Sequence, residues 1–312
     1  MFNDDQRDDD IIIEEEEDFL DDPVEEEEQG QEEEAIEEEI IGDDTETEEP
    51  EQEPEPQAPR LSQRVNRGGQ SVNRGFETDV DMVFVIDLTY SMQPLLDNIK
   101  QHALVFNEEV REALKGKNRT MRNLRIKIIG FRDHYFDWED PSHPPIEESE
   151  FFDIPEQQEE FAAFLRRLEP AGGEDDPESA LEALHLAFHS DWKTPEEGKT
   201  SRQMVILFTD NAAHPLDDPM RTNPEFNSHY PEGIPESLEA LQDEYMDPTV
   251  FPPTRNGLVK GHRLILFAPE NMYPWEQVKG WEATTIASMD PENGLDGLDM
   301  GMVYALIGGS MN

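Results

Sequence analysis

The chain has 312 residues, no cysteine, and 75 acidic against 24 basic residues, which give it a formal net charge of -51. The lack of cysteine excludes disulfides, thiol catalysis and zinc-thiolate sites, and the lack of a basic footprint makes nucleic-acid binding unexpected. Since no apolar run is long enough to span a bilayer and the N-terminus is not typical of a secretory leader, we expect a cytoplasmic protein without membrane contact.

The start of the chain holds much of the acidic charge. Residues 1–60 contain 30 Asp or Glu residues and only two basic residues, Arg7 and Arg60. With so little apolar surface, this segment cannot offset the conformational entropy lost on folding. We therefore predict a disordered acidic arm and linker over residues 1–78, followed by one globular domain over residues 79–312.

Apolar runs and helical patterns alternate along the predicted domain. In chain order, they predict a strand at Met82–Ile86, a helix at Met92–Leu114, a strand at Leu124–Phe131, a short strand at Phe151–Ile154, a helix around Phe161–Leu168, a helix at Pro177–Trp192 with Asp176 as its N-cap, strands at Met204–Phe208 and Arg263–Phe267, a short strand at Thr284–Ala287 and a helix at Leu295–Leu306. Strands that are apolar throughout are buried on both faces. This order is typical of an α/β fold with a doubly wound, mostly parallel sheet flanked by helices.

Polar side chains follow several of these strands, at the edge where such sheets bind ligands. They are Asp87, Thr89 and Ser91 after the first strand, Arg132, Asp133 and His134 after the second, Glu174, Asp175 and Asp176 before the helix at Pro177, and Thr209 and Asp210 after the strand at Met204. Carboxylate and hydroxyl oxygens are the hard ligands that Mg²⁺ prefers. Four separate segments therefore bring acids or hydroxyls to one edge.

Taken together, these segments resemble the von Willebrand factor type A (VWA) domain and its metal-ion-dependent adhesion site (MIDAS). The family pattern has an Asp and two hydroxyls at alternate positions after strand one, matched here by Asp87, Thr89 and Ser91, and an Asp after a later strand, matched by Asp210. The resemblance covers about residues 80–311. It implies a VWA fold, which is Rossmann-like.

Three further segments are similar to a subgroup of these domains found in alpha-kinase-linked and bacterial proteins. They are Phe131–His134 after the second strand, Gly172–Glu178 in the second metal loop and Thr209–His214 in the third. The departures from the subgroup pattern are Glu174 for Gly, Asn211 for Ala, and Ala212 and Ala213 for two prolines.

The resemblance implies a role for each matched residue. The hydroxyls of Thr89 and Ser91 would coordinate Mg²⁺ (or Mn²⁺), Asp87 and Asp210 would hold it directly or through water, and Asp175 would take the second-loop position. Mg²⁺ keeps exchangeable water ligands, so an Asp or Glu of a partner protein would complete the coordination. No catalytic residue and no other cofactor-binding residue is expected, and the chain is not expected to be an enzyme.

Structural interpretations of the same residues stay open. Asp87 and Ser91 are also suited to cap a helix beginning at Met92, and Asp175 or Asp176 to cap the helix at Pro177. Asp133 and His134 fit a structural or ligand-rim pair better than a catalytic one.

Three classes of function follow. The first is a metal-dependent protein-protein interaction module or scaffold, whose partner is an AAA+ ATPase, a kinase or a protease, as the resemblance suggests. The second is an acidic chaperone or mimic that binds basic proteins through the arm. The third is a metal-dependent hydrolase. The sequence argues against it, because it shows no clear general base, no phosphate-binding glycine loop and no GxSxG motif.

The acidic arm has two interpretations of its own. Charge runs are usually solvated, which favours a solubilising or autoinhibitory role, the latter through arm carboxylates that compete for the metal site. Alternatively, the arm docks on a basic partner through apolar residues set among its acids, namely Ile11, Ile12, Ile13, Phe19, Leu20, Ala35, Ile36, Ile40 and Ile41.

Overall fold

The computed structural model describes residues 76–115, 119–136, 141–173, 177–194, 200–224, 230–252, 261–288 and 298–310. The predicted acidic arm lies outside the described residues as far as residue 75, and residues 76–78 belong to the first strand, β1 (Phe76–Asp87). None of the helices in the described stretches is long and apolar enough to cross a membrane.

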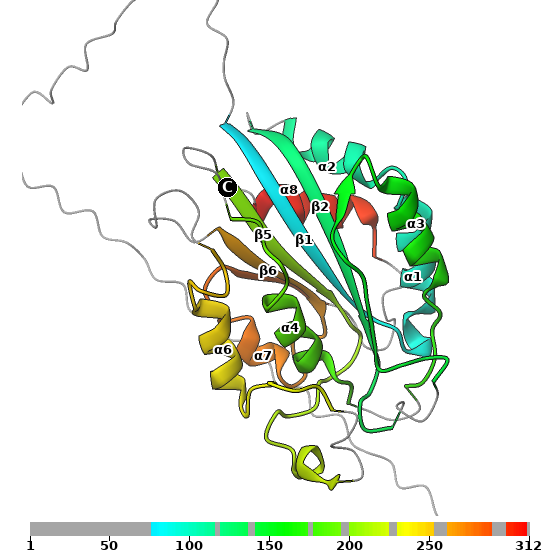
Figure 1. Cartoon of the computed structure of the whole chain (residues 1–312), viewed down its shortest axis with the longest axis vertical. Helices are drawn as coiled ribbons and strands as arrows, with labels where there is room; N and C mark the ends of the chain where they lie inside the picture. Colours follow the sequence, from blue (N-terminus) through cyan, green and yellow to red (C-terminus); the bar gives the residue numbers. More distant parts are fainter. Residues whose placement is uncertain are drawn as a thin grey trace, which may run out of the picture. The chain divides into compact units, whose positions relative to one another are not determined.

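A seven-stranded sheet forms the centre of the described part (Figure 1). Its parallel strands are β1, β2 (Arg119–Phe131), β5 (Thr200–Phe208), β6 (His262–Ala268) and β7 (Thr284–Ser288). Two short strands, β3 (Ile146–Glu148) and β4 (Phe152–Ile154), pair antiparallel with β2, and the order across the sheet is β3-β2-β1-β5-β6-β7. The predicted mostly parallel sheet is confirmed, and it fits the VWA-like architecture that the resemblance implies.

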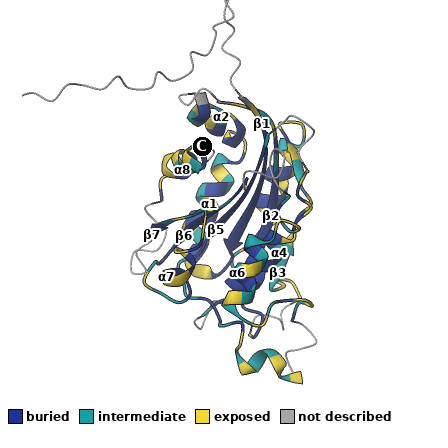
Figure 2. Ribbon diagram, turned by 90° about the vertical axis from the view of Figure 1, so that its left-hand side faces the viewer, coloured by how far each residue is buried: buried dark blue, intermediate teal, exposed yellow. Residues whose placement is uncertain are grey.

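The apolar run of β1 supplies both faces of the sheet. Met82 and Phe84 belong to the hydrophobic cluster on one face, whereas Val83 and Val85 belong to the cluster on the other. Successive side chains of a strand point to opposite faces, so only a strand covered on both sides buries such a run completely. The strands accordingly lie buried between two layers of helices (Figure 2).

Helices cover both faces, as predicted. The helices of one layer are α1 (Gln93–His102), α2 (Phe106–Lys115), α3 (Gln158–Arg167) and α8 (Met300–Ser310), and those of the other layer are α4 (Ala180–Phe188), α6 (Leu238–Met246) and α7 (Trp275–Val278) (Figure 1). Two short 3-10 helices are η1 (Tyr90–Met92) and η3 (Pro219–Thr222). Among the α-helices, the sequence does not predict α6 and α7.

The prediction of one helix over Met92–Leu114 is wrong, because a turn at residues 103–105 separates α1 from α2. Leu104 and Val105, which continue the apolar helical pattern, are exposed at this turn. The carbonyl of Leu104 accepts a hydrogen bond from the side-chain amide of Gln158 on α3. A contact with a distant helix thus stabilises the break, which the local pattern does not reveal.

The predicted helix at Pro177–Trp192 is shorter than expected, and its start is corrected. The N-cap residue of α4 is Ser179, because Glu178 forms an isolated parallel bridge with Ala213 that keeps the preceding backbone extended. Asp176, the predicted cap, lies outside the described residues. The last helix, α8, begins at Met300, later than predicted.

The strand order defines where a ligand site belongs. From β1 the chain adds β2 on one side, and later β5 pairs with the other side of β1. The carboxyl ends of β1 and β5 therefore flank the point at which the winding direction reverses, which is where open α/β sheets bind ligands.

Candidate metal centre

Asp87, the last residue of β1, joins the loops that follow β1 and β5. Its carboxylate is fully buried, and its Oδ1 accepts hydrogen bonds from the backbone N–H of Thr89 (2.9 Å) and from Thr89 Oγ1 (2.7 Å). Its Oδ2 accepts a hydrogen bond from Thr209 Oγ1 (2.8 Å). One carboxylate thus fixes two hydroxyl side chains from segments far apart in the sequence.

The electrostatics of Asp87 suit a site for a cation. Burial raises the pKa of Asp87 to about 6, the hydrogen bonds from Thr89 and Thr209 oppose this rise, and the charge of Asp210 adds to it. A positive charge nearby would favour the ionised form.

A line of oxygens runs from this buried carboxylate toward the surface. Thr89 Oγ1 lies 3.2 Å from Ser91 Oγ, and Ser91 Oγ donates to Asp210 Oδ1 at 3.1 Å. Thr89 is buried, whereas Ser91 is exposed. The structure therefore brings together four of the five residues predicted from the sequence: Asp87, Thr89, Ser91 and Asp210.

The fifth predicted residue, Asp175, lies outside the described residues, together with Glu174 and Asp176. The described residues before it pack directly on the first loop: the N–H of Ala171 donates to the carbonyl of Leu88 (2.8 Å). Gly173 has a φ of +77°, and a Cβ added to it would lie 2.6 Å from the Cβ of Thr89. Only glycine allows this approach of the second loop to Thr89.

The second and third loops are also joined to each other. Beyond the undescribed residues, the N–H of Glu178 donates to the carbonyl of Ala212 (3.1 Å), and the N–H of His214 donates to the carbonyl of Glu178 (2.9 Å). Hence the described residues on either side of Glu174–Asp176 contact the first and the third loop, respectively.

The sequence marks Thr209 only as a polar residue at a strand end and does not reveal its role. Besides its bond to Asp87, Thr209 Oγ1 accepts a hydrogen bond from the N–H of Asn211 (3.2 Å). The carbonyl of Asn211 in turn accepts a hydrogen bond from the indole of Trp275 (2.8 Å). The sequence signal was a hydroxyl directly before Asp210, at the end of a buried strand.

The residues after β2 have structural contacts. The guanidinium of Arg132 is buried and donates to the carbonyls of Pro144 (2.7 Å) and Glu169 (2.6 Å) and to Glu147 Oε1 (2.9 Å). Asp133 Oδ1 accepts hydrogen bonds from the N–H of Tyr135 (2.9 Å) and from Ser179 Oγ (3.3 Å), and His214 Nε2 lies 3.3 Å from it.

His134 is also part of this framework, since its backbone N–H donates to Ser179 Oγ (2.9 Å). Burial lowers the pKa of its imidazole to about 4. These contacts link the loops around the oxygen cluster and agree with the structural interpretation of Asp133 and His134.

The donor set fits Mg²⁺. In an octahedral magnesium site with bonds of about 2.0–2.1 Å, neighbouring ligand oxygens are about 2.9 Å apart. The separations of 3.2 Å between Thr89 and Ser91 and of 3.1 Å between Ser91 and Asp210 are close to this value. These ligands are all oxygens, with no imidazole nitrogen that would favour zinc.

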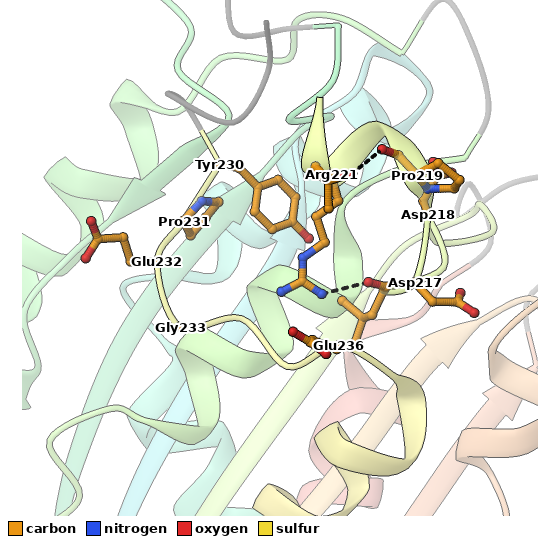
Figure 3. Close-up of a pocket in the computed structure, with 11 residues that line it drawn as sticks. Asp217, Asp218, Pro219, Arg221, Tyr230, Pro231, Glu232, Gly233 and Glu236 are labelled. Carbon is orange, nitrogen blue, oxygen red and sulfur yellow. Dashed lines mark hydrogen bonds between the residues drawn. The ribbon is translucent and has the colours of Figure 1, made fainter. Parts of the chain in front are cut away.

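A separate pocket of about 810 Å³ lies along the segment between β5 and α6 (Figure 3). Arg221 and four acids line it, namely Asp217, Asp218, Glu232 and Glu236. None of the four predicted site residues that the structure describes lines this pocket. Arg221 donates to the carbonyls of Leu216 (2.7 Å), Ile234 and Pro235, so its hydrogen bonds join the two ends of the segment that lines the pocket.

The chain was compared with known proteins. No protein-family model matches it, and no curated protein does. Among solved structures, it is similar to the pilus adhesin SpaC from Lactobacillus rhamnosus GG in an open conformation (13% identity, TM-score 0.42, covering 75% of this chain and 30% of the adhesin) and to a second structure of that adhesin (12% identity, TM-score 0.41, 75% and 30%). It is also similar to proximal thread matrix protein 1 from the mussel byssus (12% identity, TM-score 0.37, 75% and 46%). The chain thus spans less than half the length of these proteins, and the similarity assigns it neither a family nor a function.

Proposed function

We propose that this chain is a metal-dependent protein-interaction module, in which the oxygen cluster at the ends of β1 and β5 holds Mg²⁺ and a partner's Asp or Glu completes the coordination. The observation that carries the proposal is the continuous contact from Asp87 through Thr89 and Ser91 to Asp210. When bound there, Mg²⁺ supplies an exchangeable coordination position for a carboxylate oxygen.

Each residue has a distinct role in this proposal. Asp87 orients the hydroxyl of Thr89 through two hydrogen bonds and is fully buried, so it sets geometry. Ser91 is exposed, and Tyr90 beside it has 65% of its surface exposed, so both are available to a partner. Asp175 of the second loop is proposed as a further ligand, as the sequence predicts.

The charge of the chain supports a role for the metal in selecting the partner. With a net charge of -51, the protein repels acidic surfaces. A partner carboxylate would therefore gain binding energy only where a cation offsets the negative potential. An AAA+ ATPase, a kinase or a protease remains the proposed class of partner.

The test is capture of partners by the immobilised full chain from a cell extract, in buffer with Mg²⁺ and in buffer with EDTA. We expect a set of partners that is lost in EDTA and lost with Asp87→Ala or Ser91→Ala. Asp97→Ala, which removes an exposed carboxylate on α1, is the matched control and retains them.

Two outcomes would contradict the proposal. Capture that does not depend on Mg²⁺ or on Ser91 rejects a metal-bridged contact. Capture that is insensitive to EDTA but lost at high salt favours instead the alternative of an acidic arm that binds basic proteins.

A further inference from the structure

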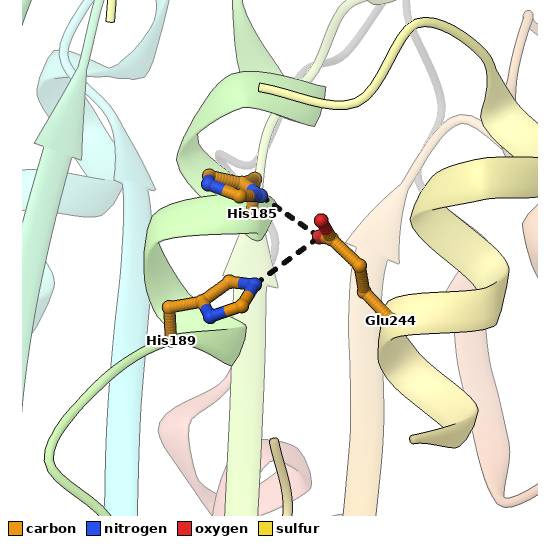
Figure 4. Close-up of side chains that lie close together, drawn as sticks. All are labelled: His185, His189 and Glu244. Carbon is orange, nitrogen blue, oxygen red and sulfur yellow. Dashed lines mark hydrogen bonds and ion pairs between the residues drawn. The ribbon is translucent and has the colours of Figure 1, made fainter. Parts of the chain in front are cut away.

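A second cluster of ligand side chains lies on α4 and α6 and contains none of the predicted site residues. His185, His189 and Glu244 point toward one another (Figure 4), and their ligand atoms all lie within 4.8 Å of one another. Glu244 Oε2 is 2.8 Å from His185 Nδ1 and 3.4 Å from His189 Nε2.

Local structure explains why these side chains meet. His185 lies in the last turn of α4 and His189, four residues on, is the C-cap residue of this helix, so both lie on the same side of its end. Glu244 lies in the last turn of α6, which packs beside α4 through the contact of Tyr245 with Phe188 (ring centroids 5.2 Å apart). The carboxyl end of a helix carries partial negative charge, so the ends of both helices favour a cation between them.

The ligand types and distances select the kind of metal. Two imidazoles and one carboxylate form a known zinc ligand set, with bonds of about 2.0–2.2 Å. Tetrahedral ligands at that bond length are about 3.3 Å apart, a value that lies between the 2.8 Å from Glu244 Oε2 to His185 Nδ1 and the 3.4 Å from Glu244 Oε2 to His189 Nε2. Mg²⁺ prefers oxygen ligands and is poorly suited to this cluster.

We propose that His185, His189 and Glu244 form a binding site for Zn²⁺ that joins α4 to α6. The three side chains leave one position of a tetrahedral ion for water or for a partner's side chain. The exposed fractions of the side chains are 10% for His185, 24% for Glu244 and 44% for His189, so the ion enters from the His189 side.

Burial lowers the pKa of His185 from its ordinary value, Glu244 opposes this shift, and His189 and Arg221 reinforce it. Asp247, the C-cap residue of α6, lies near enough to His189 for the two charges to interact. Its carboxylate therefore adds negative charge near the cluster.

A contact without a metal would look partly similar, because one glutamate can hydrogen-bond two histidines. Zinc binding distinguishes the two arrangements, because only a metal site predicts that substitution of His189 or Glu244 weakens it. His143 offers a matched control, since it contacts Glu169 (Nε2 to Oε2 3.6 Å) as a single histidine and carboxylate pair.

The experiment is a titration of the full chain with Zn²⁺ in excess Mg²⁺, which is added to compete with Zn²⁺ for the carboxylates of the acidic arm and of the oxygen cluster. We expect one zinc equivalent bound, with an affinity reduced about 100-fold or more by His189→Gln and by Glu244→Gln. His143→Gln should leave the affinity unchanged. His189 is largely exposed, so His189→Gln should fold, which circular dichroism checks.

Cobalt gives a second measurement, because Co²⁺ in a tetrahedral nitrogen and oxygen site absorbs visible light strongly. The wild type should show this absorption, and His189→Gln should not. Zinc binding that is equally strong in His189→Gln, Glu244→Gln and His143→Gln would overturn the proposal, as would the absence of a saturable zinc site in the wild type.

Discussion

At the level of single residues, burial raises the pKa values of two carboxyl groups, those of Asp87 and Glu182. Asp87 accepts hydrogen bonds from the hydroxyls of Thr89 and Thr209, whereas Glu182 on α4 is fully buried, accepts a hydrogen bond from Tyr230, and lies near enough to His214 and Asp133 for their charges to act on it. Burial raises the pKa of Glu182 to about 7, from an ordinary value of 4.5. This rise makes the stability of the fold depend on pH.

The direction of this pH dependence follows from whether the folded or the unfolded chain keeps the proton on Glu182. Between about pH 4.5 and pH 7 the folded chain keeps the proton on Glu182 and the unfolded chain loses it, so stability falls as the pH rises through this range. We predict that Glu182→Gln removes this fall. The change that the substitution causes in the free energy of unfolding should be about 2–3 kcal/mol more favourable at pH 8 than at pH 4.5.

Urea unfolding at both pH values measures this difference. Glu160→Gln, an exposed acid on α3, is the control and should follow the wild type at both. A Glu182→Gln variant whose pH dependence parallels the wild type would show that Glu182 is ionised in the folded state at no cost.

At the scale of elements, the second loop depends on a glycine that touches Thr89. Gly173→Ala places a methyl group 2.6 Å from the Cβ of Thr89 and also puts an alanine at a φ of +77°. We predict a loss of about 2–4 kcal/mol in the free energy of unfolding, together with weaker Mg²⁺ binding because Thr89 is displaced.

Gly233→Ala separates the cost of a positive φ from the cost of the clash with Thr89. Its φ is +82°, but a Cβ there meets nothing within 4 Å, so it carries the backbone cost of about 1 kcal/mol alone. Equal losses of stability for the two variants, with Mg²⁺ binding unchanged in Gly173→Ala, would mean that the loop does not press on Thr89.

The elements also show how far the sequence could predict the fold. The apolar halves of the strands were found because burial on both faces leaves continuous runs. The first half of β1 was missed because Asp79 and Asp81 are unlike strand residues, yet both are buried against arginines of the neighbouring strand β2. Arg125 donates to both oxygens of Asp81, at 2.9 Å and 2.6 Å, and Arg122 binds Asp79.

The candidate sites show the same limit. Asp87, Thr89 and Ser91 are close in sequence, and strand-end logic added Asp210, so this cluster was predictable. The pairing of His185 with Glu244 joins residues 59 positions apart, across two helices of which one was not predicted. The spacing of His185 and His189 alone does not indicate a third ligand.

At the scale of the whole molecule, the charge is unevenly distributed between the arm and the domain. With 30 acids and only two arginines in residues 1–60, we expect the arm to contribute little to the stability of the domain. Deletion of residues 1–59 should change the melting temperature by less than about 2 °C, and capture of partners should remain sensitive to EDTA.

Thermal unfolding and the capture assay measure these two quantities at fixed salt. A rise in partner affinity on deletion would support autoinhibition by the arm. If the truncated chain no longer captures any partner, binding resides in the arm and the oxygen cluster is not the interaction site.

Calorimetric titration of the full chain with Mg²⁺ measures whether the oxygens after β1 and β5 hold this ion. Ser91→Ala is the decisive variant, because this hydroxyl is exposed and its removal should leave the fold intact. We predict a saturable Mg²⁺ site in the wild type and in Asp97→Ala, weakened at least about 10-fold in Ser91→Ala and Asp87→Ala. Identical titrations for all four proteins would show that these oxygens do not hold Mg²⁺.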